Sequence, residues 1–183
     1  VSGQPAMRGL QRTWVTDGAV RNEIGFGQKT ASVLLVDVDS ERVVLIPSDE
    51  KQYVQLALDA YREVVSMRLR GSGLAEDGAK PVLEATGKTR TIGDWDCTGY
   101  RFRLQGKLEI DMELWIAADT REDFAAYLRT VRRIGLDQVL GRMGELADQL
   151  PGFPIEATME MVHHGQKVIS SQRVRSIETR TVE

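Results

Sequence analysis

The residues best suited to chemistry are few in this sequence. His163 and His164 are adjacent, with no third histidine in the chain and no acid at ligand spacing beside them. Neighbouring residues of a strand point to opposite faces, and in a tight turn both face solvent, so we interpret the pair as an exposed turn rather than a zinc or acid–base site. Cys97 would need one of these histidines as its base, so we expect a small, buried strand residue instead.

Three acids spaced two apart, Glu109, Asp111 and Glu113, could serve as paired catalytic carboxylates. Arg101 and Arg103 precede them in another alternating segment, and antiparallel pairing would set arginines opposite acids. We therefore interpret these side chains as a solvated charged face. With no catalytic constellation and no metal-ligand set, the sequence predicts a protein that is not an enzyme and holds no metal or cofactor.

Charge and hydropathy bound the class of partner. The formal net charge of the 183 residues is −3, so no global attraction to nucleic acid is expected. Arg129, Arg132 and Arg133 form a small basic patch on a predicted helix, which we interpret as solvated. No apolar run approaches the roughly 18 residues that a transmembrane helix needs.

The segment from Leu108 to Ile116 alternates without a break and predicts a strand with one face on a core and the other largely in water. Residues 100–104 alternate in the same way. A three-residue loop at 105–107 would pair Leu104 with Leu108, Phe102 with Ile110, Tyr100 with Met112, Arg103 with Glu109 and Arg101 with Asp111.

Hairpin signals recur on both sides of this segment. Asp17-Gly18 predicts a turn that pairs Val15 with Val20, Trp14 with Arg21 and Arg12 with Glu23. A second hairpin joins residues 33–38 to 42–46, and both of its strands are apolar on both faces, which predicts central strands covered on both sides. Residues 81–92 predict another strand, and a last hairpin turns at His164-Gly165, pairing Met161 with Val168 and Glu156 with Arg173.

Helical periodicity appears in two regions. Residues 56–70 repeat apolar side chains every three or four positions. A second helix is expected from Thr120, its N-cap, with Asp123 as the acidic partner, and it continues or kinks past Gly135 to Leu150. The sequence thus predicts one α+β domain over residues 1–183, mainly antiparallel, with a curved half-barrel sheet of about nine or ten strands and two helical insertions over its concave face.

Apolar side chains on the inward strand faces are the remaining candidates for a site. Methionine adapts to irregular apolar shapes, so this face suits either an ordinary core or a cavity for a hydrophobic ligand. The candidate ligand-binding residues are Tyr100, Phe102, Ile110, Met112, Leu114, Met159 and Met161.

The segment from Thr89 to Tyr100 contains an Ile-Gly-x-x-x-Cys-x-x-Tyr pattern at Ile92-Gly93, Cys97 and Tyr100. It resembles the signature of a bacterial family of exported proteins known as a domain of unknown function. The region from Val33 to Tyr53 and the strand from Glu113 to Ala117 resemble that family too, so that the resemblance spans residues 20–177. Its predicted fold is similar to the LolA and LolB lipoprotein carriers, a half-barrel with a helical lid over an apolar cavity.

This resemblance implies a periplasmic or envelope-associated protein of the lipoprotein-carrier kind, with a hydrophobic ligand such as a lipid or acyl chain. The chain begins at Val1 without a recognisable signal peptide, which fits an exported protein whose signal sequence was removed or trimmed. The functional prediction is a non-catalytic envelope protein that binds such a ligand in the concavity of its sheet. The alternative is a structural or protein-interaction module with a fully packed core that forms a homodimer.

Overall fold

The computed structural model describes residues 8–26, 29–47, 52–71, 81–105, 108–135, 146–163 and 166–178. The chain divides into two compact units, one of residues 1–65 and 129–136 and one of residues 66–128 and 137–183. Each unit contains one five-stranded antiparallel sheet. The predicted α+β class with mainly antiparallel strands is therefore confirmed, but the single curved sheet is wrong, because the ten strands form two separate sheets.

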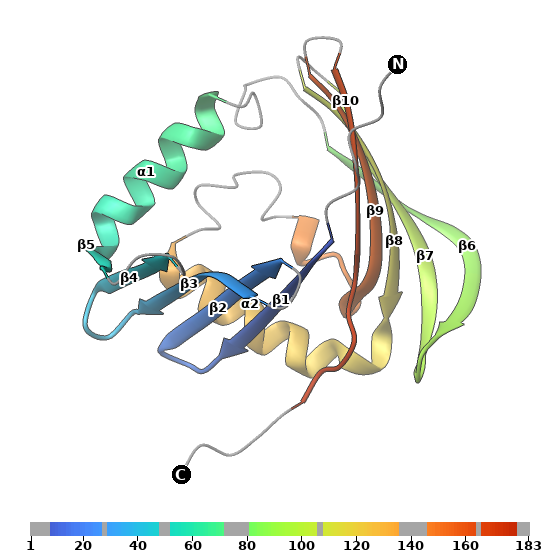
Figure 1. Ribbon diagram of the computed structural model, residues 1–183. Coiled ribbons are helices and arrows are strands. Elements are labelled where there is room, and N and C mark those ends of the chain that lie inside the picture. The colour runs from blue at the N-terminus through green and yellow to red at the C-terminus, as the bar shows by residue number, and fades with distance from the viewer. Residues whose placement is uncertain are drawn as a thin grey trace. The chain divides into compact units, whose positions relative to one another are not determined.

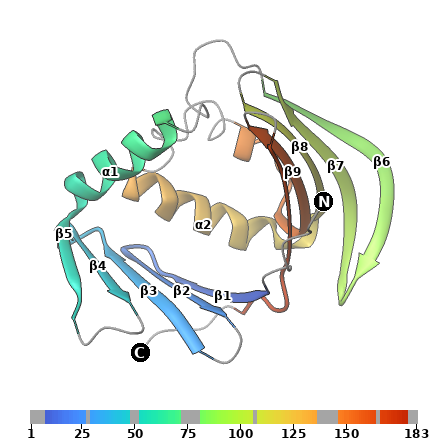
Figure 2. The same ribbon diagram turned by 45° about the horizontal axis from the view of Figure 1, so that its top comes forward.

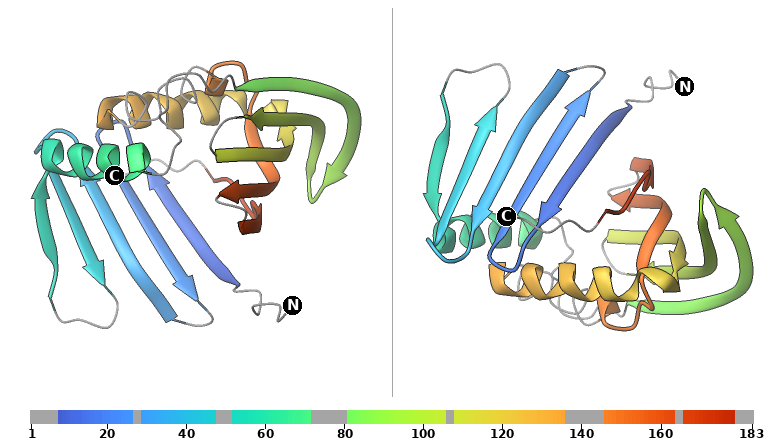
Figure 3. Two further views of the ribbon diagram at one scale, coloured as in Figure 1. Left: turned by 90° about the horizontal axis from the view of Figure 1, so that it is seen from above. Right: turned by 90° about the horizontal axis from the view of Figure 1, so that it is seen from below.

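The first sheet follows the chain order and consists of β1 (Gly9–Val15), β2 (Ala19–Phe26), β3 (Lys29–Asp37), β4 (Arg42–Pro47) and β5 (Val54–Ala57) (Figure 3). Each strand pairs antiparallel with the next one along the chain. The predicted first hairpin is confirmed, including the pairing of Val15 with Val20. A hydrogen bond of 2.9 Å from the Thr16 amide to the Ala19 carbonyl closes its Asp17-Gly18 turn.

The core of the first unit is small. Its buried residues are Val36 and Val43 of the sheet, Leu58 at the start of α1 (Leu58–Gly71), and Ile134 at the end of α2 (Arg121–Ile134). The prediction that β3 and β4 are internal strands is confirmed. Full coverage of both their faces is not, because the Leu45 side chain is 40% exposed.

The second sheet has the strand order β10-β9-β8-β7-β6. Its strands are β6 (Val82–Ile92), β7 (Trp95–Leu104), β8 (Leu108–Ala117), β9 (Phe153–His163) and β10 (Gln166–Arg173). Figure 2 shows the strong curvature of β6 to β9. Gly87, with a φ of +70°, lies where the pairing of β6 with β7 shifts register, so this glycine marks a bulge in β6.

The predicted register of the central hairpin is wrong by two residues. Leu104 pairs with Ile110 and Phe102 with Met112, so that five residues rather than three separate the last paired positions of β7 and β8. A shift of two residues preserves the alternation of faces, so the apolar side chains still share one face. The predicted register depended on an assumed loop length between the two strands. The prediction of which side chains share a face depended only on the alternation of residues.

The charged face also differs from its prediction. Asp111 bonds Arg101 diagonally rather than from the position directly opposite, and Arg103 bonds Glu84 of β6 at 2.6 Å. Trp115, expected on the wet face, is only 8% exposed. The Arg90 guanidinium lies 4.0 Å from the centre of its ring, where it covers the indole and makes a cation–π contact.

The helices begin close to their predicted positions. The buried stripe of α1 starts at Leu58 and includes Tyr61, whereas Val64, expected in the stripe, is 39% exposed. The α2 helix begins at Arg121, directly after Thr120, and ends before Gly135, whose φ is +79°. Most of the predicted continuation, at residues 136–145, lies outside the described residues, as does the His164-Gly165 turn, while the pairings of Met161 with Val168 and Glu156 with Arg173 are confirmed.

Candidate functional site

The seven residues predicted to bind a ligand lie together on one face of the second sheet. Adjacent rows across β7, β8 and β9 place Phe102 beside Met112 and Met112 beside Met159, and place Ile110 beside Met161. Tyr100 and Leu114 form a third row. Alternation therefore identified a real apolar face that residues distant in sequence build together.

Three of these seven residues are core residues. Phe102, Ile110 and Leu114 are 4%, 6% and 7% exposed, whereas the other four are half-buried and pack against them. Leu146 and Leu150 also pack on this cluster. The segment from Leu146 to Leu150, drawn in orange, lies inside the curve of the sheet, so the apolar face is the concave one (Figures 1 and 2).

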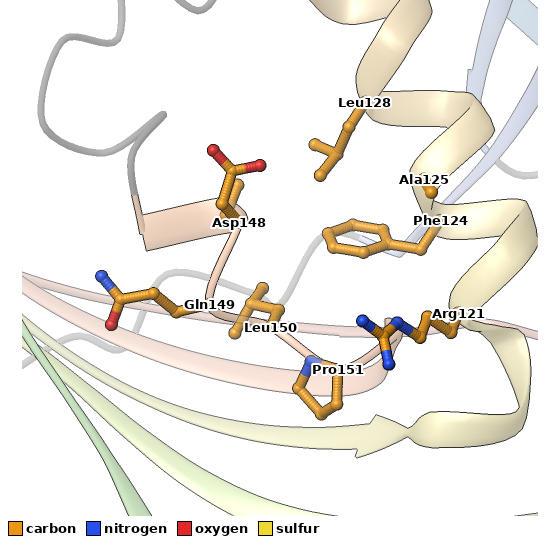
Figure 4. Close-up of a pocket in the computed structure, with 9 residues that line it drawn as sticks. Arg121, Phe124, Ala125, Leu128, Asp148, Gln149, Leu150 and Pro151 are labelled. Carbon is orange, nitrogen blue, oxygen red and sulfur yellow. The ribbon is translucent and has the colours of Figure 1, made fainter.

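A pocket of about 370 Å³ lies between this covering segment and the first half of α2 (Figure 4). Its volume falls within the range of small-molecule sites, about 300–1,000 Å³. Phe124 and Leu128 form one wall of the pocket, and Leu150 forms the other. The described residues that line it are Arg121, Phe124, Ala125, Leu128, Ala147, Asp148, Gln149, Leu150 and Pro151.

None of the seven predicted residues lines this pocket. They lie one layer below, and Leu150 joins the two layers, because it lines the pocket and packs on the sheet cluster. Phe124 and Leu128 lie in the helix that the sequence predicts from Thr120, but they were not assigned to a site. The sequence does contain a signal for the site, because Phe124 and Leu128 repeat at helical spacing and a second apolar group follows at Leu146 and Leu150.

The α2 wall is anchored to the sheet by aromatic contacts. The rings of Phe124 and Phe153 lie 5.1 Å apart, edge to face, and that of Tyr127 lies 5.7 Å from Phe153. Such pairs add about 0.5–1.5 kcal/mol beyond the area that they bury. Burial also raises the pKa of the Tyr127 hydroxyl, since the phenolate would lose its hydration.

Two hydrogen bonds of the Thr120 hydroxyl hold the start of α2 beside the start of β9. The buried Thr120 hydroxyl donates to the Ala117 carbonyl at 2.7 Å and accepts a hydrogen bond from the Phe153 amide at 2.8 Å. Any Cβ at residue 152 would overlap the Ala117 carbonyl, so Gly152 is required for this close approach. The start of α2 and the start of β9 are thus held in one fixed geometry.

Charged side chains of opposite sign line the pocket at separate ends. Arg121, at its Pro151 end, is exposed, and the described residues give its guanidinium neither a hydrogen bond nor an ion pair. Asp148, an exposed residue, lies at the other end, near Leu128 (Figure 4). The apolar side chains of Phe124, Leu128 and Leu150 lie between them.

The residues of the Ile-Gly-x-x-x-Cys-x-x-Tyr pattern have structural positions in the second sheet. Gly93, with a φ of +61°, forms the turn between β6 and β7, and Ile92 and Cys97 are buried beside Trp115. Burial raises the pKa of the Cys97 thiol, which disfavours the nucleophilic thiolate. The prediction that Cys97 is a buried strand residue is confirmed.

Other candidates for chemistry are engaged in ion pairs. The hydrogen bond from Arg101 holds the pKa of Asp111 below its usual value, and Arg133 of the predicted basic patch bonds Asp39 at 2.8 Å. Within the described ranges, no group of three or more His, Cys, Asp or Glu residues has the arrangement of a metal site, and none of the helices is both long enough and apolar enough to cross a bilayer. His164 and the side chain of His163 lie outside what the structure describes.

Comparisons with known proteins identify no relative. No family model matches the chain, and no match was found among curated proteins or among solved structures. The resemblance to the exported bacterial family thus stays a prediction from short motifs, and the function must be argued from the geometry of the pocket.

Proposed function

We propose that the protein is a non-catalytic binding protein of the bacterial envelope that holds a hydrophobic ligand, such as a lipid or acyl chain, on the concave side of its second sheet. The observation that carries this proposal is the pocket of about 370 Å³ between Phe124 and Leu128 on α2 and Leu150 on the covering segment. The proposed ligand therefore contacts the pocket walls rather than the seven sheet residues predicted from the sequence.

Packing supports a distinction between pocket residues that contact the ligand and sheet residues that support the pocket. Phe102, Ile110 and Leu114 are too deeply buried to meet a ligand without rearrangement, and they form a dense support beneath Leu150. The four half-buried residues are three adaptable methionines and one amphipathic tyrosine, namely Met112, Met159, Met161 and Tyr100. A longer acyl chain that displaced Leu150 would meet these side chains next.

The proposed location rests on sequence alone. The motif around Cys97 resembles exported bacterial proteins whose predicted fold is similar to the LolA and LolB carriers, and a periplasmic or envelope-associated position follows from that likeness. Fractionation of the producing bacterium, with antibody detection of the protein in periplasm, membrane and cytoplasm, tests it directly. Recovery in the cytoplasm alone would contradict an envelope role.

Ligand binding is tested by titrating the protein with an environment-sensitive apolar dye and by native mass spectrometry after incubation with a neutral alcohol such as decanol. Ala125→Trp is the informative variant, because Ala125 lines the pocket and is exposed, so the larger ring fills space without entering the core. We expect saturable binding to the wild type and at least a tenfold loss in the variant. Equal binding by both proteins, or none by the wild type, would refute the site.

A second candidate function has its own observation. Val33, Leu35, Val44 and Ile46 lie on the face of the first sheet opposite Val36 and are half-buried, outside every buried cluster of the described residues. Trp14, on the same face, is 47% exposed. An apolar face of this kind fits the alternative prediction of a homodimer or protein-interaction module.

The solution mass distinguishes this candidate. Light scattering coupled to size-exclusion chromatography should give a dimer for the wild type and a monomer for Val44→Lys if the face is an interface between copies. A monomeric wild type over a wide concentration range would reject self-association through this face. Ile169→Lys, on strand β10 of the second sheet, where Ile169 is 62% exposed, controls for the added charge.

A further inference from the structure

We infer that the pocket of the second unit selects amphiphiles with an anionic head, and that Arg121 binds this head while the chain lies against Phe124 and Leu128. This inference rests on the proposed function and adds the chemical class of the ligand. The occupant to which it commits is a monocarboxylate with a medium-length alkyl chain.

Charge complementarity carries the inference. Among the described residues that line the pocket, Arg121 is the only cation, and its guanidinium has no hydrogen-bonding or ionic partner in the described part of the chain. Figure 4 shows it directed toward Pro151, beneath the Phe124 ring and at the rim of the apolar space. Guanidinium groups bind carboxylates in a bidentate geometry, which gives orientation as well as affinity.

The place of Arg121 in the pocket sets the direction of the ligand. The head group is expected at the Arg121 end and the chain tail toward Leu128 at the other end (Figure 4). The apolar surfaces of Phe124 and Leu150 between these ends contact the chain. A neutral alcohol of equal length keeps the apolar contacts but loses the ion pair, and a cationic amphiphile meets repulsion at the rim.

The experiment compares decanoate, decanol and decyltrimethylammonium by isothermal titration calorimetry below their micelle-forming concentrations. We expect decanoate to bind the wild type most tightly. Arg121→Ala should weaken decanoate binding about five- to tenfold and leave decanol binding within twofold, because the ion pair is partly exposed. Arg121→Lys should retain part of the preference, since it keeps the charge without the bidentate geometry.

Arg129→Ala is the matched control. Arg129 is exposed, lies on the same helix and does not line the pocket, so its removal changes the net charge equally without touching the site. Its binding profile should equal that of the wild type. If Arg129→Ala weakens decanoate binding as much as Arg121→Ala, the preference is a general charge effect and the inference fails.

The remaining outcomes separate this inference from the proposed function. Equal binding of decanol and decanoate, unchanged by Arg121→Ala, would overturn the anionic head while leaving an apolar pocket. No binding of any of the three amphiphiles to the wild type would refute the proposed function and this inference together. Thermal unfolding of each variant, expected within about 2 °C of the wild type, shows that losses of affinity are not losses of fold.

Discussion

The two sheets share a topology and differ in how they are filled. Both are five-stranded antiparallel sheets in which each strand pairs with the next along the chain. The second has two buried clusters, one on its concave face and one around Cys97 and Trp115 where Val174 and Ile177 pack. The first has four buried core residues, and it leaves Leu45 and Val54 40% and 50% exposed.

The difference lies in the sequence pattern rather than in the amount of apolar residue. β7 and β8 alternate over most of their length, so one face collects most of the large apolar side chains and closes over them, while Trp115 packs in a second cluster on the other face. β3 and β4 are apolar on both faces, which divides the same kind of residue between two surfaces. Apolar content alone therefore does not make a core, because burial requires that the side chains converge.

The largest expected contrast comes from the same substitution in each sheet. Leu114→Ala removes a side chain that is 7% exposed and should cost about 3 kcal/mol in the free energy of unfolding. Leu45→Ala, at a site 40% exposed, should cost less than about 1 kcal/mol. Denaturant titration followed by amide exchange in each sheet measures both. Equal costs would show that Leu45 is covered in solution, by a partner or by another copy.

Two glycines with positive φ provide a smaller contrast. Gly135 ends α2, and a Cβ there would lie 2.7 Å from Nε of Arg62, which donates to the Ile134 carbonyl at 2.6 Å. Gly87 in the β6 bulge has no atom within 4 Å of the same position. Alanine should cost about 1 kcal/mol at Gly87 from backbone strain alone and about 2 kcal/mol at Gly135, where Arg62 must also move. Thermal unfolding measures both, and a larger loss at Gly87 would contradict this packing.

The smallest expected effect is electrostatic. Asp111 has a lowered pKa because Arg101 bonds its charged form, so it stabilises the fold above the pKa of the unfolded carboxyl, and this contribution is lost as the pH falls through the folded pKa. The pair is half exposed, so Asp111→Asn should cost only about 0.5 kcal/mol at pH 7. The difference from the wild type should shrink as the pH falls below the usual aspartate pKa of about 3.9 and vanish once Asp111 is protonated in the folded protein. A difference that persists after that protonation would mean that shape, not charge, makes the contact.

How much the sequence could predict depended on the kind of information each feature requires. Strict alternation located the apolar face of β7, β8 and β9, and the Asp17-Gly18 turn determined a register correctly, because both signals are local. The register at residues 105–107 could not be read, since loop length is not encoded in alternation. The division into two sheets depends on which strands pair over long distances, and no local pattern distinguishes ten strands of one sheet from two sets of five.

The site was predictable only in its lower layer. Phe102 and its neighbours on the sheet were expected to contact the ligand. They lie beneath the pocket instead, because Leu146 and Leu150 pack on them. Arg121 gave no signal, because a single arginine at a helix start has no motif. Trp115 was misplaced because Arg90, distant in sequence, covers its ring.

The most direct test of the account is where an apolar ligand binds. In a methyl-labelled sample saturated with decanol, nuclear Overhauser contacts should connect the alkyl chain to Leu128 and Leu150 of the second unit. Contacts to the exposed Leu45 and Val54 of the first sheet, with none to Leu128 or Leu150, would contradict a carrier pocket on the concave face.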